Sequence, residues 1–247
     1  MPKTKNVTKR MVFFVIVVCI LLPVMIWGAN FLLRDSSYWV ISAVLLVLPM
    51  VAFVLHWEWR SPQPAEIALL AVLTAITIVA NLMSITMIPF QAGTAMVILC
   101  GIGFGPEMGC FVGMLARFGV NFFYGQGAWT PWQMAGWGLM GLLAGLLFYQ
   151  KIRISLPPKR IPMTLFGFFA TVIFYGGIVN LSTVIFSGIL SQFSWSAVFA
   201  VYLAGIPYDM LHGLGTAFFL ACFGSLLYRA MRRVKEKYGF FLMESEN

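Results

Sequence analysis

Runs of apolar residues recur along most of this 247-residue chain, and they restrict its fold more than any other feature. Many of them reach about 20 residues, enough to span a hydrocarbon core of about 30 Å. Because lipid offers no hydrogen-bond partners, a spanning segment must be a helix or part of a closed barrel. Barrel strands alternate apolar and polar residues in pieces of about 10, whereas these runs are unbroken. The sequence therefore predicts an all-α membrane protein.

The composition excludes a soluble fold. The chain is 61% hydrophobic and 10% charged, whereas a soluble domain carries about 25% charged residues. The net charge of +8 could indicate a nucleic-acid partner. However, the basic residues lie at the ends of apolar runs, which is typical of a topology signal. We therefore expect membrane lipid as a partner, and no nucleic acid.

About eight transmembrane spans are predicted. Their ranges are Met11–Leu33, Tyr38–Trp57, Ala65–Met87, Gly93–Gly103, Glu107–Tyr124, Pro131–Gln150, Ile161–Phe186 and Pro207–Met231. The first run is too long for a signal peptide and a second follows at once, so we interpret it as a retained span. The last span is expected to begin at Pro207, because proline suits the first position of a helix. The stretch from Ser187 to Ile206 is then a loop.

The basic residues support this layout. Alternating spans put all of the 16 Lys and Arg residues on one side, except Arg34 and Arg117. By the positive-inside rule that side is cytoplasmic. The sequence thus predicts a multi-pass protein of the cell membrane with both termini in the cytoplasm.

Motifs for catalysis and for energy conversion are missing. The sequence contains no GxxxxGK[ST], HExxH or GxSxG pattern, has two histidines, and has four cysteines without a CxxC pair. We expect no enzyme activity, no cofactor and no metal site. A passive channel, a binding subunit energised by other proteins, and a scaffold remain.

Amides and aromatic rings gather between the fifth and sixth spans. Interfacial aromatic belts account for Trp129 and Trp132, but not for Asn121, Gln126 and Gln133 so close together. Aromatic walls with a few oriented amides are typical of a small-molecule site. The candidate substrate-binding residues are Asn121, Tyr124, Gln126, Trp129, Trp132, Gln133, Asn180, Tyr208, Asp209 and His212.

Arg117 lies about halfway along the fifth span. A charge inside a membrane usually faces a partner or a cavity, and Asp209 is a candidate mate. A structural ion pair or a snorkelling side chain is the alternative to a functional role. Asp209 is expected in the first turn of the last span, where the helix dipole favours an anion, and His212 shares its face.

Small residues repeat every four positions in two spans. Ala71 and Ala75 share one face of the third span, which indicates either packing within the bundle or docking of a partner subunit. Gly105, Gly109 and Gly113 repeat in the same way, and close helix packing is the favoured interpretation.

These features together resemble a known family. From Ala65 to Arg233 the chain is similar to the substrate-binding S component of energy-coupling-factor (ECF) vitamin transporters. The resemblance rests on Ala71-x-x-x-Ala75, on Gly103-Phe-Gly-Pro-x-x-Gly, on Gly125-Gln-Gly-Ala-Trp-Thr-Pro-Trp-Gln-Met, and on Gly205-Ile-Pro-Tyr-Asp-Met-Leu-His-Gly.

The resemblance implies a fold and an assembly. It implies a six-helix core over residues 61–235, preceded by two extra spans in residues 1–60 and followed by a cytoplasmic tail, 236–247. Such S components bind a vitamin from outside and dock on a transmembrane coupling subunit with two ATPases; Ala71 and Ala75 would contact the coupling subunit. The branch with the Gly125–Met134 run looks most like members linked to cobalamin or its precursors. Thr216 stands where relatives have Asn.

Two other functions remain open at this point. The chain could be a polytopic membrane enzyme that uses Arg117, Asp209 and His212, although no reaction class follows from the sequence. It could also be a stand-alone transporter or channel that needs no ATPase.

Overall fold

The computed structural model describes residues 47, 50, 51, 63–84, 90–149, 159–189 and 193–238, and in these ranges the chain is helical and contains no strand. The helices are α4 (Pro64–Met83), α5 (Gly93–Phe104), α6 (Pro106–Tyr124), α7 (Thr130–Ala144), α8 (Arg160–Ala170), α9 (Gly176–Phe186) and α10 (Trp195–Tyr238). A π-helical turn, Gly145–Tyr149, extends α7, and another, Thr171–Tyr175, joins α8 to α9. The helical class predicted from the sequence is confirmed.

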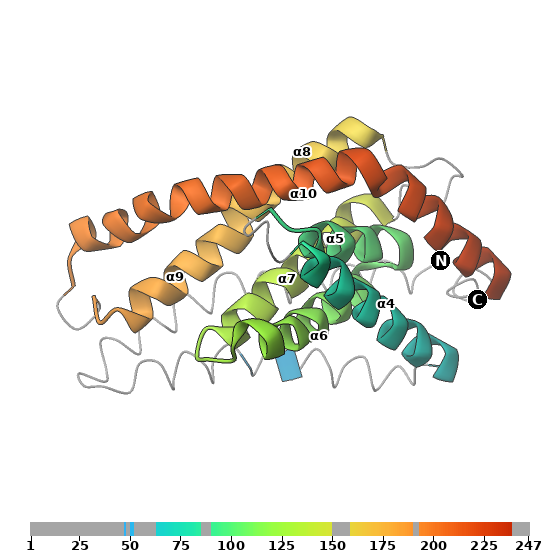
Figure 1. The fold of residues 1–247 in the computed structure, drawn as a ribbon, viewed down its shortest axis with the longest axis horizontal. Coiled ribbons are helices and arrows are strands. Elements are labelled where there is room, and N and C mark those ends of the chain that lie inside the picture. Colours follow the sequence, from blue (N-terminus) through green and yellow to red (C-terminus); the bar gives the residue numbers. More distant parts are fainter. Residues whose placement is uncertain are drawn as a thin grey trace, which may run out of the picture.

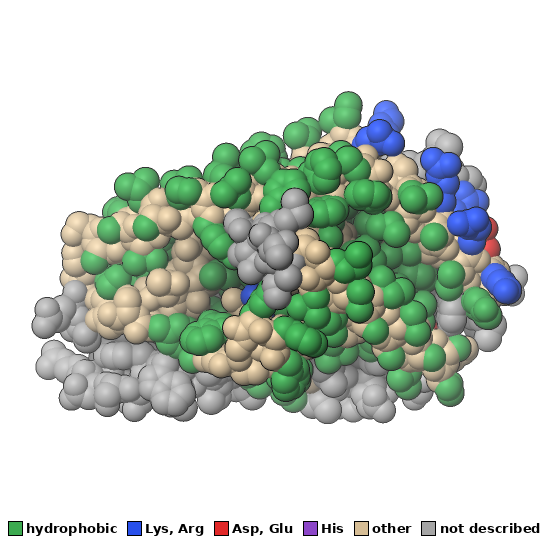
Figure 2. Space-filling model, viewed as in Figure 1, with side chains coloured by type: hydrophobic (Ala, Val, Ile, Leu, Met, Phe, Trp, Pro, Cys, Tyr) green, Lys and Arg blue, Asp and Glu red, His purple; other side chains and the backbone are tan. Residues whose placement is uncertain are grey.

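Helices α8 and α9 run in one direction as a continuous stretch, and α10 returns beside them (Figure 1). Lys and Arg side chains gather at one end, which we call the basic end, as Figure 2 shows. It contains Lys159 and Arg160 at the start of α8 and the basic residues from Arg229 to Lys237 in the last turns of α10. Within the described ranges, three helical stretches are long and apolar enough to cross a membrane: Pro64–Met83, Arg160–Phe186 and Trp195–Tyr238.

Local sequence signals set the helix starts. At α4, Pro64 occupies the first turn, and the backbone N–H of Gln63 donates to Glu66 Oε2 at 3.3 Å, which forms half of a capping box. At α6, Gly105 has a φ of 105°, a left-handed conformation that favours glycine, and Pro106 follows it. This sharp connection folds α6 back beside α5.

Helix α5 forms the centre of the bundle. All 12 of its residues are buried, and α4, α6, α7 and α10 pack around it. At a rise of 1.5 Å per residue it is about 18 Å long, too short to cross the hydrocarbon core. The predicted short segment from Gly93 is therefore confirmed as a helix, but one enclosed in protein.

Glycine backbones allow α5, α6 and α7 to touch. A Cβ at Gly109 would lie 2.5 Å from Gly101 Cα and 2.7 Å from the Gly141 carbonyl oxygen. A Cβ at Gly113 would lie 2.4 Å from the Trp137 carbonyl oxygen. The close packing predicted from the glycine repeat is therefore present.

The predicted start of the last helix is wrong. Helix α10 begins at Trp195, and Pro207 lies inside it. The expected loop from Ser187 to Ile206 is therefore mostly helix, and Asp209 is not in a first turn. The physical reason is the lipid environment. A helix that ended within lipid would leave several backbone groups unpaired, whereas an internal proline removes only one hydrogen bond.

The predicted N-terminal pair of spans and the C-terminal tail lie largely outside the described residues. Of the N-terminal pair, the structure describes Met50, which packs against the hydrophobic core. At the other end, α10 continues to Tyr238, past the expected start of the tail at residue 236. The count of eight spans and the division into three parts stay predictions.

Replacing Gly109 by alanine should lower the free energy of unfolding by about 1–3 kcal/mol, because the new methyl group meets backbone atoms that cannot move independently. Gly177→Ala is the matched control, since a Cβ there meets no atom within 4 Å. Thermal unfolding of both variants in detergent measures the difference. Equal midpoints would show that the three backbones are not in contact.

Candidate functional site

A network of amides and one hydroxyl connects the end of α6 to the start of α7. Asn121 Nδ2 donates to Gln133 Oε1 at 2.8 Å and to Thr130 Oγ1 at 3.1 Å. The Thr130 hydroxyl donates to Gln126 Oε1 at 2.9 Å and accepts from the Gly127 backbone N–H at 3.1 Å. The three amides that stood out in the sequence are therefore in one network, which fixes the turn between α6 and α7.

Arg117 joins this network from one turn earlier in α6. Its Nε donates to Gln133 Oε1 at 3.0 Å, and its guanidinium carbon lies 5.2 Å from the Trp137 ring centroid and 5.9 Å from that of Tyr124. The side chain is only 8% exposed. The expected ion pair with Asp209 is absent from the described structure: geometry on α6 and α7 directs the guanidinium toward Gln133. We call Arg117, Asn121, Gln126, Thr130 and Gln133 the Arg117 cluster.

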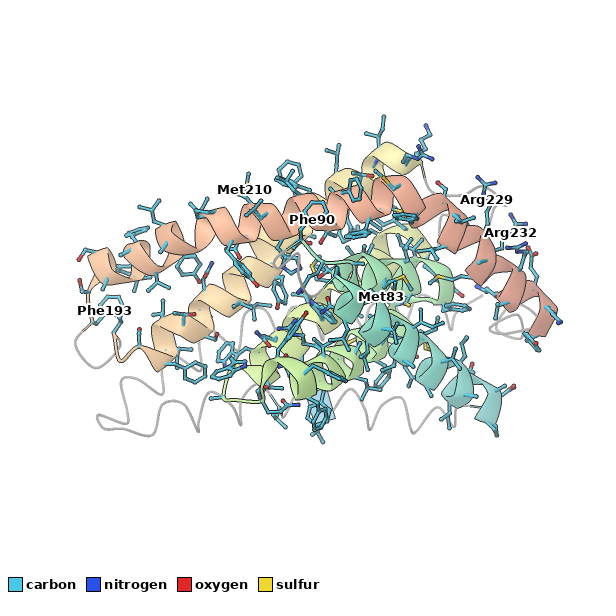
Figure 3. The ribbon with its side chains drawn as sticks, in the orientation of Figure 1. Met83, Phe90, Phe193, Met210, Arg229 and Arg232 are labelled. Atoms are coloured by element: carbon cyan, nitrogen blue, oxygen red, sulfur yellow. The ribbon has the colours of Figure 1, made fainter. Side chains whose placement is uncertain are left out.

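Tyr124 links the same region to α4 and α5. Its hydroxyl accepts from Gln91 Nε2 at 2.8 Å and from Asn81 Nδ2 at 3.3 Å. Gln91 stands two residues before α5, and Phe90 beside it packs against Phe218 on α10, with ring centroids 5.4 Å apart. Figure 3 shows Met83, at the end of α4, and Phe90 near the middle of the bundle, away from Arg229 and Arg232 at the basic end.

Helix α10 contributes a second polar group. Asp209 is buried and accepts from Asn180 Nδ2 of α9 at 2.7 Å. His212, also buried, has Nε2 2.9 Å from Thr94 Oγ1 of α5, and its ring meets the edge of Tyr175 with centroids 4.9 Å apart. These contacts tie α10 to α5, to α9 and to the π-helical turn before α9.

Packing contacts connect the two polar groups. The Arg117 guanidinium lies over the Trp137 ring of α7, α7 packs against the π-helical turn that contains Tyr175, and the Tyr175 ring contacts His212. Tyr208 is half exposed, at 50%. The structure thus brings most of the predicted site residues around one region, where α6, α7, α9 and α10 come together away from the basic end.

The two predicted tryptophans differ in environment. Trp129 is 46% exposed, but Trp132 is only 1% exposed and packs with Ile185. Trp132 is therefore a core residue and not an interfacial anchor, because the α6–α7 turn directs it into the bundle. Trp129 alone of the pair is available at the surface.

Several polar residues of the region were not predicted from the sequence. These are Asn81, Gln91, Thr94, Thr130 and Tyr175. Asn81 is fully buried within an apolar run, and this feature was visible in the sequence as a costly polar residue in a span. Thr94 and Tyr175 gave no such signal, since their partners are far away in the chain. Thr216 accepts from Thr171 at 3.3 Å and donates to the His212 carbonyl at 3.0 Å.

The alanine face of α4 is exposed and lies opposite the face that packs against the described part of the bundle. Ala71 and Ala75 are exposed, as is Ala68 beside them, whereas Leu73, Thr77 and Asn81 on the opposite face are buried. In the part of the chain that the structure describes these alanines lie on an exposed face, and both interpretations of the repeat stay predictions.

Comparison with known families identifies the chain. Residues 63–232 match the model of the family described as ECF-type riboflavin transporter, S component. The chain belongs to this family. The predicted S-component resemblance is therefore confirmed, and the family is one of transport subunits rather than enzymes. Together with the apolar helices, it makes the chain a multi-pass membrane protein.

The chain is also similar to part of a curated protein. A UPF0397 protein of Vibrio atlanticus (strain LGP32) is 30% identical over 86 residues, which cover 35% of this chain and 46% of that protein. The chain thus matches about half the length of this relative. No solved structure matches the chain.

Replacing Thr130 by valine should lower the free energy of unfolding by about 1–3 kcal/mol, because Asn121 and the Gly127 N–H lose a buried acceptor. Thr183→Val is the control: Thr183 is exposed and bonds within its own helix. Thermal unfolding should leave the control within about 0.5 kcal/mol of the parent. A loss of the same size in both variants would contradict the network.

Proposed function

We propose that this S component captures a vitamin-type substrate from outside the cell, and that it docks on a transmembrane coupling subunit whose two ATPases supply the energy. The observation that carries the proposal is the family match over residues 63–232. The Arg117 cluster and the polar group of α10 support a capture site, because they place oriented amides, aromatic rings and charges in one region. The chain itself has no nucleotide-binding motif.

The distribution of charge supports an orientation. In the described ranges, every Lys and Arg except Arg117 lies at the basic end, which by the positive-inside rule we place in the cytoplasm. The α6–α7 turn and the α9–α10 connection then face outward. The region around Arg117 is on this outer side of the bundle, where a substrate arrives.

Two substrates have specific support. The Gly125–Met134 run resembles members linked to cobalamin, and a corrinoid carries many amide groups that Gln126 and Gln133 can meet by hydrogen bonds. The description of the family names riboflavin, whose flat ring would suit Trp and Tyr side chains. We propose cobalamin or a precursor as the substrate and riboflavin as the second candidate.

A binding screen on the detergent-purified chain tests the capture function. A panel of vitamins, including cobalamin, cobinamide and riboflavin, is titrated while tryptophan fluorescence is recorded, and bound ligand is identified by mass spectrometry. We expect saturable binding of one panel member at micromolar concentration or below. If no vitamin binds, the capture function is wrong.

The docking surface is proposed on α4. Ala71 and Ala75 are exposed and small, so another helix can approach the α4 backbone closely. Bulky apolar neighbours, including Ile67, Val72 and Ile76, flank them and would add contact area.

Replacing both Ala71 and Ala75 by tryptophan should reduce co-purification with the coupling subunit and ATPases at least about tenfold, because the indoles hold the partner helix away. Vitamin binding by the isolated variant should stay within twofold of the parent. Ala204→Trp on α10 is the matched control, since Ala204 is also an exposed helical alanine. Intact assembly and uptake with both tryptophans present would exclude this docking surface.

Two further experiments address the alternatives. Vesicles reconstituted with this chain alone should accumulate no vitamin; accumulation without ATPases would establish a stand-alone transporter. For a membrane enzyme that uses Asp209, the replacement Asp209→Asn should abolish conversion of a bound ligand while sparing its binding. Recovery of every bound ligand chemically unchanged argues against that function.

A further inference from the structure

The guanidinium of Arg117 is only partly used by the protein. Its Nε is hydrogen-bonded to Gln133, but among the described residues its two terminal nitrogens have no hydrogen-bond partner. Neither terminal nitrogen is sealed from solvent. By contrast, Asn121 Oδ1 and Trp137 Nε1 are buried without a partner in the described ranges. Four N–H groups of a largely buried cation are thus available to a ligand.

The charge of Arg117 lacks a nearby counter-charge. Of the four described carboxylates, Glu66 and Glu107 lie in the first turns of α4 and α6, and Glu236 pairs with Arg232 at 2.6 Å near the end of α10. The fourth, Asp209, forms no ion pair with Arg117 and accepts a hydrogen bond from Asn180 instead. The rings of Trp137 and Tyr124 attract the cation but carry no net charge.

The surroundings hold the guanidinium in one orientation. Gln133 Oε1 accepts from both Arg117 and Asn121, so its two lone pairs are filled. The Gln133 side chain is thereby fixed with its Nε2 as an additional donor, which has no partner among the described residues. The region therefore offers several donors around a fixed cation.

We propose that Arg117 binds an anionic group of the substrate, a phosphate or a carboxylate, with Gln133 Nε2 beside it. The planar fork of a guanidinium matches two oxygens of either group, and the low dielectric of the site strengthens the pairing. This inference rests on the proposed capture function and narrows its substrate class. Cobalamin carries one phosphodiester, whereas cobinamide and riboflavin carry no phosphate. The geometry thus favours cobalamin over both.

Matched ligands test the anion preference. Wild-type protein is titrated with riboflavin and riboflavin 5′-phosphate, and with cobinamide and cobalamin, at constant ionic strength. We expect the phosphate-bearing member of the bound pair to bind at least about tenfold more tightly. A preference for the phosphate-free member, or equal affinities, would overturn the inference without requiring any variant.

Variants then assign the preference to Arg117. Arg117→Met should lower the affinity for the phosphate-bearing member at least about tenfold and change that for its phosphate-free partner less than twofold. Arg117→Lys keeps the charge and should retain part of the preference. Arg229→Met, which removes an exposed cation at the basic end, should behave as wild type. If Arg117→Met and Arg117→Lys both lose affinity equally for the phosphate-bearing and the phosphate-free ligand, the role of Arg117 is structural. That result would contradict anion binding.

Inorganic phosphate separates this inference from the capture function. Added phosphate should raise the thermal midpoint of wild-type protein relative to chloride at equal ionic strength, and Arg117→Lys should reduce that gain. If no vitamin binds but phosphate stabilises through Arg117, the capture function fails and the anion site stands. If a vitamin binds but phosphate has no effect and the matched ligands bind equally, the anion site fails alone.

Discussion

The contact of three glycine backbones determines the rest of the structure. Gly101, Gly109 and Gly141 bring α5, α6 and α7 so close that no Cβ fits between them. In a bilayer, apolar surface gains little by leaving lipid, so van der Waals contact between closely approaching backbones is a main source of cohesion. Every residue of α5 is buried, and α6 and α7 pack directly against it. This packing fixes the positions of the polar ends of α6 and α7.

The sequence predicted the helices well because apolar length and helix-starting prolines are local signals. The expected start at Pro131 lies one residue after the true start of α7 at Thr130. Pro207 carries the same signal but lies within α10, since a helix in lipid keeps its backbone bonded around a proline rather than ending. The neighbourhood of Asn121 and Gln133 was predictable from their proximity in the chain. The pairing of Thr94 with His212 was not, because these residues are 118 positions apart and meet only through the packing of α5 on α10.

The correction at Arg117 has a physical reason. A charge in a span usually faces a partner or a cavity, and Asp209 was a candidate mate. The structure instead bonds Arg117 to Gln133 and Asp209 to Asn180, so each charge receives an amide. Amides orient a charge without neutralising it, and this leaves both charges effective toward a third group. A direct ion pair would have cancelled them at the site.

Helix α4 has two faces with separate roles in the proposed function. Its outer face presents Ala71 and Ala75, while its inner face places Asn81 against the hydroxyl of Tyr124, whose ring contacts Arg117. Asn81 follows Ala75 by six residues, or about 9 Å along the helix axis. A small tilt of α4 against a docked partner would therefore change the Asn81–Tyr124 contact directly. If docking and capture are coupled, the affinity of the assembled complex for its vitamin must differ from that of the free chain, and Asn81→Ala must reduce this difference.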